Sequence, residues 1–318
     1  MRIQRSVPAA ARSPVALTIG NFDGVHLGHQ AMLARLRAEG AARGLPTCVM
    51  TFEPHPREFF APDKAPTRLT SLREKLELLA ERGIDRVQVC RFNYALAQTG
   101  PEEFIERILV RGLGMRWLLI GDDFRFGARR AGDFVLLKEK AARLGYEVEA
   151  MPSVMVAEER VSSTAVRNAL GDGQLAHAAR LLGRAYSISG RVVHGDGLGR
   201  KLGFPTANVQ MKHNRPPLCG IYAVELAGVG PAPLPGVASL GVRPTVKSGG
   251  QPVLEVHVFD CSENLYGRHV RVDFLHKLRD EEKYVDLDTL TRQIVRDVEQ
   301  SRQFFIAREV AARTAARR

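Results

Sequence analysis

Two histidines, His26 and His29, stand one helical turn apart in a glycine-rich segment that covers residues 20–29. The segment follows a short apolar run, Val15–Ile19, which predicts a β-strand, and leads into residues 28–38, whose apolar positions recur at helical spacing. The first N–H groups of a helix lack partners and attract phosphate. Both imidazoles could donate hydrogen bonds to phosphate oxygens as charge builds up during a transfer reaction. The pattern predicts a group-transfer site with His26 and His29 as catalytic candidates.

The other residues of this segment are candidates for holding a nucleotide. Gly24 and Gly28 would allow a phosphate to approach the backbone closely. Asn21, Phe22 and Asp23 follow the predicted strand directly, and open α/β sheets bind ligands at the carboxyl ends of their strands. We therefore predict that all five residues contribute to nucleotide binding.

Three more polar segments follow predicted strands of the first half. Residues 51–56 read T-F-E-P-H-P, and the two prolines fix a rigid turn that could be purely structural. Residues 121–127 read G-D-D-F-R-F-G and bring the carboxylate of Asp123 to the same sheet edge. Ser163 and Thr164 begin a helix, either as ordinary N-caps or, with Arg167 one turn later, as a phosphate-binding helix start. Four such segments together favour one shared site.

The second half carries a different glycine-rich segment. Residues 190–200 read G-R-V-V-H-G-D-G-L-G-R, a strand that runs into a loop. Such a loop is often only a hairpin, but Gly195, Gly199 and Arg200 could also wrap phosphates. Thr206 and Asn208 follow directly and offer the oxygen ligands that suit Mg²⁺.

A later run, residues 254–259, alternates apolar and polar residues. A strand there would place Glu255 and His257 on one face and Leu254, Val256 and Val258 on the other. These polar residues could simply form a solvated face. The carboxylate of Glu255 could instead accept the proton of a hydroxyl group that attacks phosphate.

The elements that must position these residues differ between the two halves. Residues 15–151 alternate predicted strands and helices, with capping-box patterns at Ser71/Glu74 and Thr99/Glu102, which predicts a parallel sheet covered by helices on both faces. After a helical stretch, residues 165–182, short alternating strands predict a small antiparallel barrel. We place the domain boundary near Gly183, giving domains 1–183 and 184–318, with a terminal helix that carries Leu287, Leu290, Ile294 and Val298.

The first half resembles the nucleotidyltransferase superfamily with the H-x-G-H signature, whose fold is Rossmann-like, and the segments at 51–56 and 121–127 resemble its FAD synthetase branch. The resemblance implies that His26 and His29 bind ATP phosphates. It implies that Ser163, Thr164 and Arg167 hold the β and γ phosphates. It also implies that Asp123 and its neighbours help to place nucleotide and flavin.

The second half resembles riboflavin kinase in the segments G-R-K-L-G-F-P-T-A-N, G-I-Y-A-V, G-V-A-S-L-G-V-R-P-T, E-V-H-V-F-D, N-L-Y-G and L-R-D-E-E-K-Y. The resemblance implies that Thr206 and Asn208 ligate Mg²⁺, that Glu255 is the general base and that Arg279 lies near the phosphate end of the flavin. Tyr284 is a mild departure, since Phe is commoner there. Together the two halves resemble the bacterial bifunctional riboflavin kinase/FAD synthetases, which implies ATP, riboflavin and FMN as substrates and FAD as product.

Composition narrows the class of protein. The 318 residues have a net charge of +11, from 46 Lys and Arg against 35 Asp and Glu, but the charges are scattered, so we expect phosphorylated ligands rather than a nucleic-acid partner. The sequence contains no apolar run of about 18 residues, so we expect no membrane span. Cys48 and Cys90 lie in apolar runs and predict buried thiols in a cytoplasmic protein. The oligomeric state stays open between a monomer and a weak homo-oligomer.

Two alternatives compete with this interpretation. One is an adenylyltransferase for another phosphorylated acceptor, such as a pantetheine or a nicotinamide nucleotide, which would not need the barrel. The other is a basic RNA-binding protein with a degenerate nucleotide fold. The intact set of His26, His29, Thr206, Asn208 and Glu255 argues against degeneracy.

Overall fold

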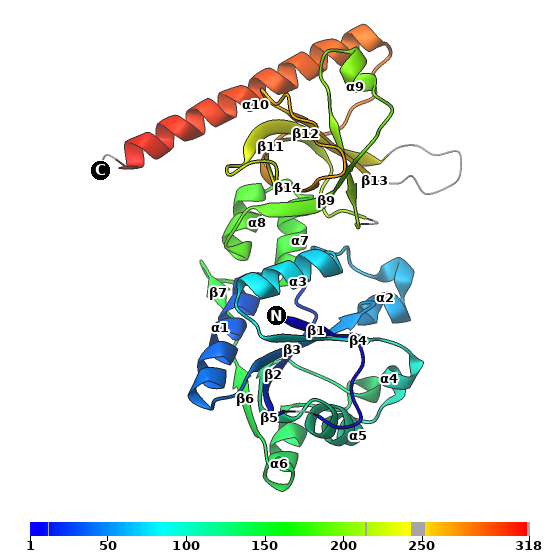
Figure 1. Ribbon diagram of the computed structural model, residues 1–318, viewed down its shortest axis with the longest axis vertical. Helices are drawn as coiled ribbons and strands as arrows, with labels where there is room; N and C mark the ends of the chain where they lie inside the picture. Colours follow the sequence, from blue (N-terminus) through cyan, green and yellow to red (C-terminus); the bar gives the residue numbers. More distant parts are fainter. Residues whose placement is uncertain (12, 214, 243–251, 317–318) are drawn as a thin grey trace. The chain divides into compact units, whose positions relative to one another are not determined.

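The computed structural model describes residues 1–11, 13–213, 215–242 and 252–316 (Figure 1). Its contacts divide the chain into two units, Met1–Pro66 with Leu72–Ser163 and Thr67–Ser71 with Thr164–Arg318. This division falls before the sequence-predicted boundary near Gly183, because the helix that ends at Leu182 packs on strands of the barrel. Tyr186 also donates a hydrogen bond from its hydroxyl to the carbonyl of Leu69, 3.1 Å away, within the second unit.

The first unit contains a parallel sheet of six strands in the order β1-β4-β3-β2-β5-β6. The strands are β1 (Arg2–Gln4), β2 (Val15–Ile19), β3 (Thr47–Glu53), β4 (Arg86–Arg91), β5 (Met115–Gly121) and β6 (Glu147–Met151). The predicted parallel sheet is confirmed. The sequence did not reveal β1, because a three-residue edge strand carries no periodicity.

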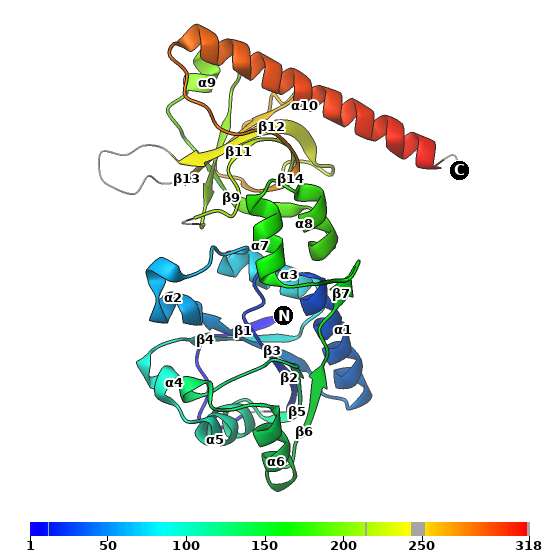
Figure 2. The same cartoon turned by 180° about the vertical axis from the view of Figure 1, so that it is seen from behind.

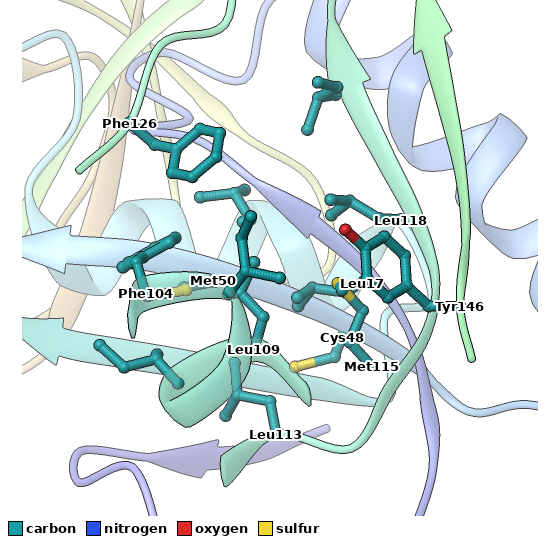
Figure 3. Close-up of a cluster of buried hydrophobic side chains, with 14 of the residues drawn as sticks. Leu17, Cys48, Met50, Phe104, Leu109, Leu113, Met115, Leu118, Phe126 and Tyr146 are labelled. Atoms are coloured by element: carbon teal, nitrogen blue, oxygen red, sulfur yellow. The ribbon is translucent and has the colours of Figure 1, made fainter. Parts of the chain in front are cut away.

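Helices cover both faces of this sheet, as predicted (Figures 1 and 2). On one face, α1 (Leu27–Ala42) and α3 (Leu72–Glu81) bury Leu33, Leu36 and Leu79. On the other face, the π-helical segment η2 (Phe104–Gly112) and α6 (Phe134–Leu144) cover a second core, to which η2 contributes Phe104 and Leu109 (Figure 3). Alternate residues of β2 and β3 point to opposite cores, as successive strand positions must. Shorter elements of this unit are α2 (Pro56–Phe60), η1 (Pro62–Lys64), α4 (Tyr94–Gln98), α5 (Pro101–Glu103), η3 (Ala128–Arg130), β7 (Met155–Val156) and β8 (Glu159–Arg160).

Two local predictions are wrong. Thr99 does not cap the helix that starts at Pro101, because its hydroxyl donates to the carbonyl of Ala95 at 2.9 Å, and Glu102 pairs with Lys140 instead. The helical stretch 165–182 is also two helices, α7 (Ser163–Gly171) and α8 (Leu175–Leu182). They are separated at Gly173, whose φ of 71° ends the first helix.

The second unit contains a closed barrel of six antiparallel strands in the order β10-β13-β12-β11-β14-β9, which confirms the predicted antiparallel barrel. The strands are β9 (Tyr186–Val193), β10 (Ala207–Met211), β11 (Gly220–Ala227), β12 (Leu234–Val242), β13 (Pro252–Val258) and β14 (His269–Arg279). A short helix, α9 (Leu198–Lys201), interrupts the loop between β9 and β10. Sequence reasoning missed β10, because its residues were assigned to the glycine-rich loop and its predicted metal ligands.

The terminal helix α10 (Leu287–Ala316) lies across the outer face of the barrel (Figure 1). Val298 and Phe305 pack there against Ile221, Val237 and Phe259. Ser301 is fully buried and donates a hydrogen bond to the carbonyl of Gly236 at 3.1 Å. The helix thus forms a wall beside the outward-facing side chains of the barrel. In the described part of the chain, no helix is both long and apolar enough to cross a membrane.

Candidate active sites

The first candidate site lies where the strand order of the sheet reverses. From β2 the chain proceeds to β3 and β4 on one side, and later to β5 and β6 on the other. The carboxyl ends of β2 and β5 are neighbours at this switch point, the usual place for a ligand in an open α/β sheet. Residues 20–29 leave β2 here, as the sequence predicts.

The two predicted histidines come together at the start of α1. His26 is the N-cap residue, and its Nδ1 accepts a hydrogen bond from the backbone N–H of His29, 3.4 Å away. The two rings stack with centroids 3.7 Å apart. A Cβ atom at position 28 would lie 3.2 Å from the His26 ring, so glycine there gives the imidazole its room. Both imidazoles thus lie at the amino end of α1.

The electrostatics of His29 favour a neutral hydrogen-bond donor. Burial lowers the pKa of His29 well below its usual value of 6.5, and positive charge on His26 and Lys75 lowers it further. Its buried Nδ1 has no hydrogen-bond partner within the described residues. A neutral imidazole can donate to a phosphate without itself losing or gaining a proton.

Backbone strain accompanies the turn that leads to these histidines. Val25 has a φ of 42° and Phe22 a φ of 48°, in the left-handed region that β-branched and bulky residues rarely adopt. Gly24 has a φ of 81°, which glycine adopts without steric strain. Phe22 and Val25 are completely buried and anchor the turn in the core. Strained backbone of this kind persists mainly at functional sites, where surrounding packing enforces it.

The remaining predicted residues of this site differ in their placement. The Phe22 ring lies 4.9 Å from the His29 ring and supports it from the core. Asn21 has a buried Oδ1 without a partner among the described residues. Asp23 is buried, and its carbonyl accepts a 2.9 Å hydrogen bond from the Ser163 hydroxyl, which brings two of the four predicted segments together. Asp123 is exposed and forms a 2.7 Å ion pair with Arg160.

Thr164 and Arg167 lie on α7 and belong to the second unit. Thr164 is exposed, and the Arg167 Nε donates a hydrogen bond to the carbonyl of Thr67. Their predicted contact with phosphates stays a prediction. In the T-F-E-P-H-P segment, His55 caps α2, since its Nδ1 accepts from the N–H of Arg57 at 3.1 Å. This cap explains His55 by a purely structural role, which is the alternative that the sequence left open for residues 51–56.

Sequence reasoning missed two features of this unit. Lys75 on α3 is 4% exposed, and its charge reaches His29. In the sequence this lysine resembles an ordinary residue of a charged amphipathic helix, so no local signal revealed it. The second feature is an aromatic cluster, in which Phe59 lies 5.4 Å from Phe92 and 5.2 Å from Tyr94. It stands just beyond the carboxyl ends of β3 and β4, and Phe60 and Tyr94 are 65% and 74% exposed.

The second candidate site lies on the outer face of the barrel. Asn208 on β10 and Glu255 on β13 are register partners on adjacent strands. A pocket of about 640 Å³ brings Glu255 together with Thr206, Gly199 and Arg279. Leu254, Val256 and Val258 are buried while Glu255 and His257 face the pocket, which confirms the predicted alternation. The first turns of α10 close one side of the pocket with Leu287, Leu290 and Ile294.

The glycine-rich loop is shaped around the predicted metal ligands. A Cβ at Gly195 would come within 2.3 Å of the Asn208 side chain, and one at Gly199 within 2.4 Å of the Phe204 carbonyl and 3.3 Å of the Thr206 hydroxyl. Only glycine leaves these oxygens in place. Their chemistry, a hydroxyl and an amide oxygen, suits Mg²⁺. Among the described residues, no group of three or more His, Cys, Asp and Glu side chains could hold a metal ion.

The side chain of Arg279 is fixed in position by an ion pair. Its guanidinium forms two hydrogen bonds to the Asp297 carboxylate on α10, at 2.8 and 2.6 Å, which raise its pKa. It also lies 5.9 Å from the ring centre of Tyr284. The pair joins β14 to α10 beside the pocket.

Arg200 lines a different hollow on the other side of Thr206. This smaller pocket, about 350 Å³, is shared by Thr206, Arg200 and Tyr266, and the Arg200 guanidinium donates to the Tyr266 hydroxyl at 3.3 Å. Thr206 thus borders both pockets. The end of the predicted G-V-A-S-L-G-V-R-P-T segment, Arg243–Thr245, lies outside the described residues.

A parallel sheet with stacked histidines at its switch point and a barrel that pairs Glu255 with Asn208 are the features of an enzyme with two separate candidate sites. Comparison with known proteins agrees. The FAD synthetase family model matches residues 9–165, and the riboflavin kinase family model matches residues 182–305. The Escherichia coli K12 bifunctional riboflavin kinase/FMN adenylyltransferase is 50% identical over 96% of this chain and 98% of its own. The Pseudomonas fluorescens protein of the same name is 50% identical over 90% of this chain and 91% of its own.

The chain belongs to the family of bifunctional riboflavin kinases/FMN adenylyltransferases. The two activities of this family make FMN and FAD, as the sequence resemblance implies. The fold also matches a Streptococcus pneumoniae crystal structure titled a macrolide-efflux protein, with a TM-score of 0.80, 26% identity and coverage of 95% of this chain and 99% of that one.

Proposed function

We propose that the second unit transfers the γ-phosphoryl group of ATP to riboflavin and that the first unit then transfers AMP from a second ATP to the FMN product. The balanced reactions are riboflavin + ATP → FMN + ADP and FMN + ATP → FAD + pyrophosphate. The observation that carries the proposal is that each unit has its own polar constellation. Glu255, Thr206 and Arg279 share one pocket of the barrel, and His26 and His29 stack at the switch point of the sheet.

We assign the two pockets beside Thr206 to different substrates on the basis of their lining residues. Glu255 can act as general base only where the attacking hydroxyl is, so the pocket of about 640 Å³ receives riboflavin. Its apolar wall from α10 suits a flat aromatic ring system. The pocket that contains Arg200 and Tyr266 then receives the nucleotide, and Thr206 lies between donor and acceptor. The ribityl 5′-hydroxyl loses its proton to Glu255 as its oxygen bonds to the γ-phosphorus, and the bridging oxygen leaves with ADP.

Thr206 and Asn208 would hold Mg²⁺, since both offer neutral oxygen ligands within a cradle that only glycine permits. A bound Mg²⁺ supplies charge neutralisation for the phosphates. The chain itself positions the hydroxyl, excludes water with α10 and accepts the proton.

In the first unit the nucleophile is an FMN phosphate oxygen, which is already anionic and needs no strong base. It forms a bond to the α-phosphorus of ATP as the bond to the pyrophosphate oxygen breaks. His26, His29 and the helix N–H groups donate hydrogen bonds to the phosphates, and Lys75 adds positive charge.

The other predicted residues of this site have supporting roles. The turn is shaped by Asn21, Asp23, Gly24, Gly28 and Ser163. Asp123 helps to place the flavin, and the roles of Thr164 and Arg167 rest on the motif that follows Ser163. The exposed cluster of Phe59, Phe60, Phe92 and Tyr94 provides a stacking surface for the flavin ring.

Paired variants test the assignment. Each of wild type, His29→Ala and Glu255→Gln is incubated with ATP and Mg²⁺ and either riboflavin or FMN, and the flavins are separated by chromatography. His29→Ala should make FMN but no FAD, while Glu255→Gln should turn FMN into FAD but phosphorylate riboflavin about 10²–10⁴-fold more slowly. Loss of both activities in a folded variant, or of neither, contradicts the assignment. Fractionation of the producing cells tests the cytoplasmic location that the sequence predicts.

A further inference from the structure

The first unit has a second concave surface, away from the histidines. A pocket of about 350 Å³ is lined by Arg2 at the start of β1, Arg86 at the start of β4 and Val15 at the start of β2. Because all strands of this sheet are parallel, their first residues share the amino edge. The histidines lie beyond the opposite, carboxyl edge. This pocket is therefore separate from the proposed adenylylation site.

The pocket is built between the sheet and the N-terminal segment. Register pairs Arg2 with Arg86 and Arg86 with Cys48, so these side chains lie on one face of the sheet. Residues 5–11 and Ser13 cover that face: a Cβ at Gly112 would come within 2.5 Å of Val7, and one at Gly114 within 2.8 Å of the Ser13 carbonyl. Glycine at these two positions thus lets the segment close over the pocket.

Positive charge around the pocket is not balanced by carboxylates. Arg2, Arg5 and Arg86 line it, and none of its lining residues is acidic. Arg86 donates to the Ser13 hydroxyl at 2.8 Å, and Arg2 and Arg5 have no ion-pair partner among the described residues. The adjacent Asp85 is occupied, since its carboxylate accepts hydrogen bonds from the Thr47 N–H and hydroxyl, both at 2.8 Å. Guanidinium groups gathered around one hollow repel each other until an anion joins them.

Other lining residues define the class of that anion. The planar fork of a guanidinium matches phosphate oxygens, and the hydroxyls of Ser6 and Ser13 can add hydrogen bonds. Pro8, Val15 and Leu113 give the same pocket an apolar wall. Its volume lies at the small end of the range for small-molecule sites, about 300–1,000 Å³.

From these observations we propose that the arginine pocket binds a phosphorylated small molecule of the mononucleotide class, independently of both catalytic sites. The phosphate would contact the arginines and the less polar part would pack on the apolar wall.

Site-resolved chemical labelling tests this proposal on the full-length protein. Phenylglyoxal modifies exposed guanidinium groups, and peptide mass spectrometry gives the labelling rate of each arginine with and without AMP. We expect AMP to slow labelling of Arg2, Arg5 and Arg86 about tenfold when it is present at about ten times its Kd. Arg111, an exposed arginine of the same unit that does not line the pocket, is the internal control and should be unaffected. The protection should persist in His29→Ala, where AMP binding at the proposed adenylylation site is weakened.

Three outcomes overturn the proposal. Unchanged labelling at the three arginines shows that the pocket does not bind AMP. Equal protection by inorganic phosphate removes the role of the apolar wall, and protection by an RNA oligonucleotide but not by AMP indicates a nucleic-acid surface. Thermal unfolding provides a second readout. AMP should raise the Tm of wild type and of Arg111→Gln by the same amount. It should raise the Tm of the double variant Arg2→Gln/Arg86→Gln clearly less.

Discussion

Replacing Asp297 by asparagine should destabilise the barrel unit and weaken riboflavin binding, while the conversion of FMN into FAD persists. Asp297 is 4% exposed and accepts two hydrogen bonds from the Arg279 guanidinium, at 2.8 and 2.6 Å. Both residues line the proposed riboflavin pocket. The pair also fixes the first half of α10 against β14, so its loss should loosen the pocket wall.

The magnitude follows from the burial of the pair. Removing one partner of a buried ion pair costs about 3–5 kcal/mol of stability. Asparagine keeps one acceptor, and the Arg279 side chain is 18% exposed and also donates to the carbonyl of Asp280, so we expect the lower end, about 3 kcal/mol. For a unit of this size, each kcal/mol corresponds to about 2–4 °C, so the Tm of the barrel unit should fall by about 9 °C.

Calorimetry and the two activities together form the assay. The matched control is Asp260→Asn, which breaks a similar two-bond pair with Arg302 on the same helix, but at a carboxylate that is 79% exposed. Solvent screens such a pair, so its loss should leave the Tm nearly unchanged. KM for riboflavin should rise in Asp297→Asn and stay constant in the control. Equal Tm shifts in the two variants would refute the reasoning that burial makes the difference.

Two further predictions concern the sites themselves. Thr206→Val removes a proposed Mg²⁺ ligand but keeps the side-chain shape. The Mg²⁺ concentration for half-maximal FMN formation should therefore rise about tenfold or more, while the concentration for half-maximal FAD formation stays unchanged. Equal Mg²⁺ curves for the variant and wild type would exclude Thr206 as a ligand. The pKa of His29 is lowered by burial, so the unfolded chain takes up a proton near pH 6.5 before the folded chain does, and stability should fall as the pH drops below about 6.5. His29→Gln should flatten this part of the pH–stability curve, and an unchanged slope would contradict the burial of His29.

The sequence predicted most of the fold because its elements carry strong local signals. Val15–Ile19 matches its predicted bounds, since an uninterrupted apolar run of this length is hard to confuse with another element there. β10 was missed because Asn208 was read as part of a ligand loop rather than as a strand residue paired with Glu255. Pairing between distant strands is a tertiary property that no local pattern contains.

The same difference between local patterns and tertiary contacts applies to the candidate sites. Residues of one continuous motif, such as His26 and His29, could be predicted because the helix start itself brings them together. Lys75 and the aromatic cluster could not, because they approach the sheet edge from separate elements and resemble ordinary helix and turn residues in the sequence.

The charge of the first site explains why its histidines need not act as acids. Burial lowers the pKa of His29, and the positive charge of His26 and Lys75 lowers it further, which favours a neutral imidazole at this site. In the proposed adenylylation, a neutral donor and a nearby cation would stabilise the charge around phosphorus without any proton transfer, which is all that an anionic FMN nucleophile requires. In the proposed phosphorylation the nucleophile is a neutral hydroxyl, and there the pocket offers the carboxylate of Glu255. The different protonation states of the two nucleophiles would then account for the different residues that we assign to the two reactions.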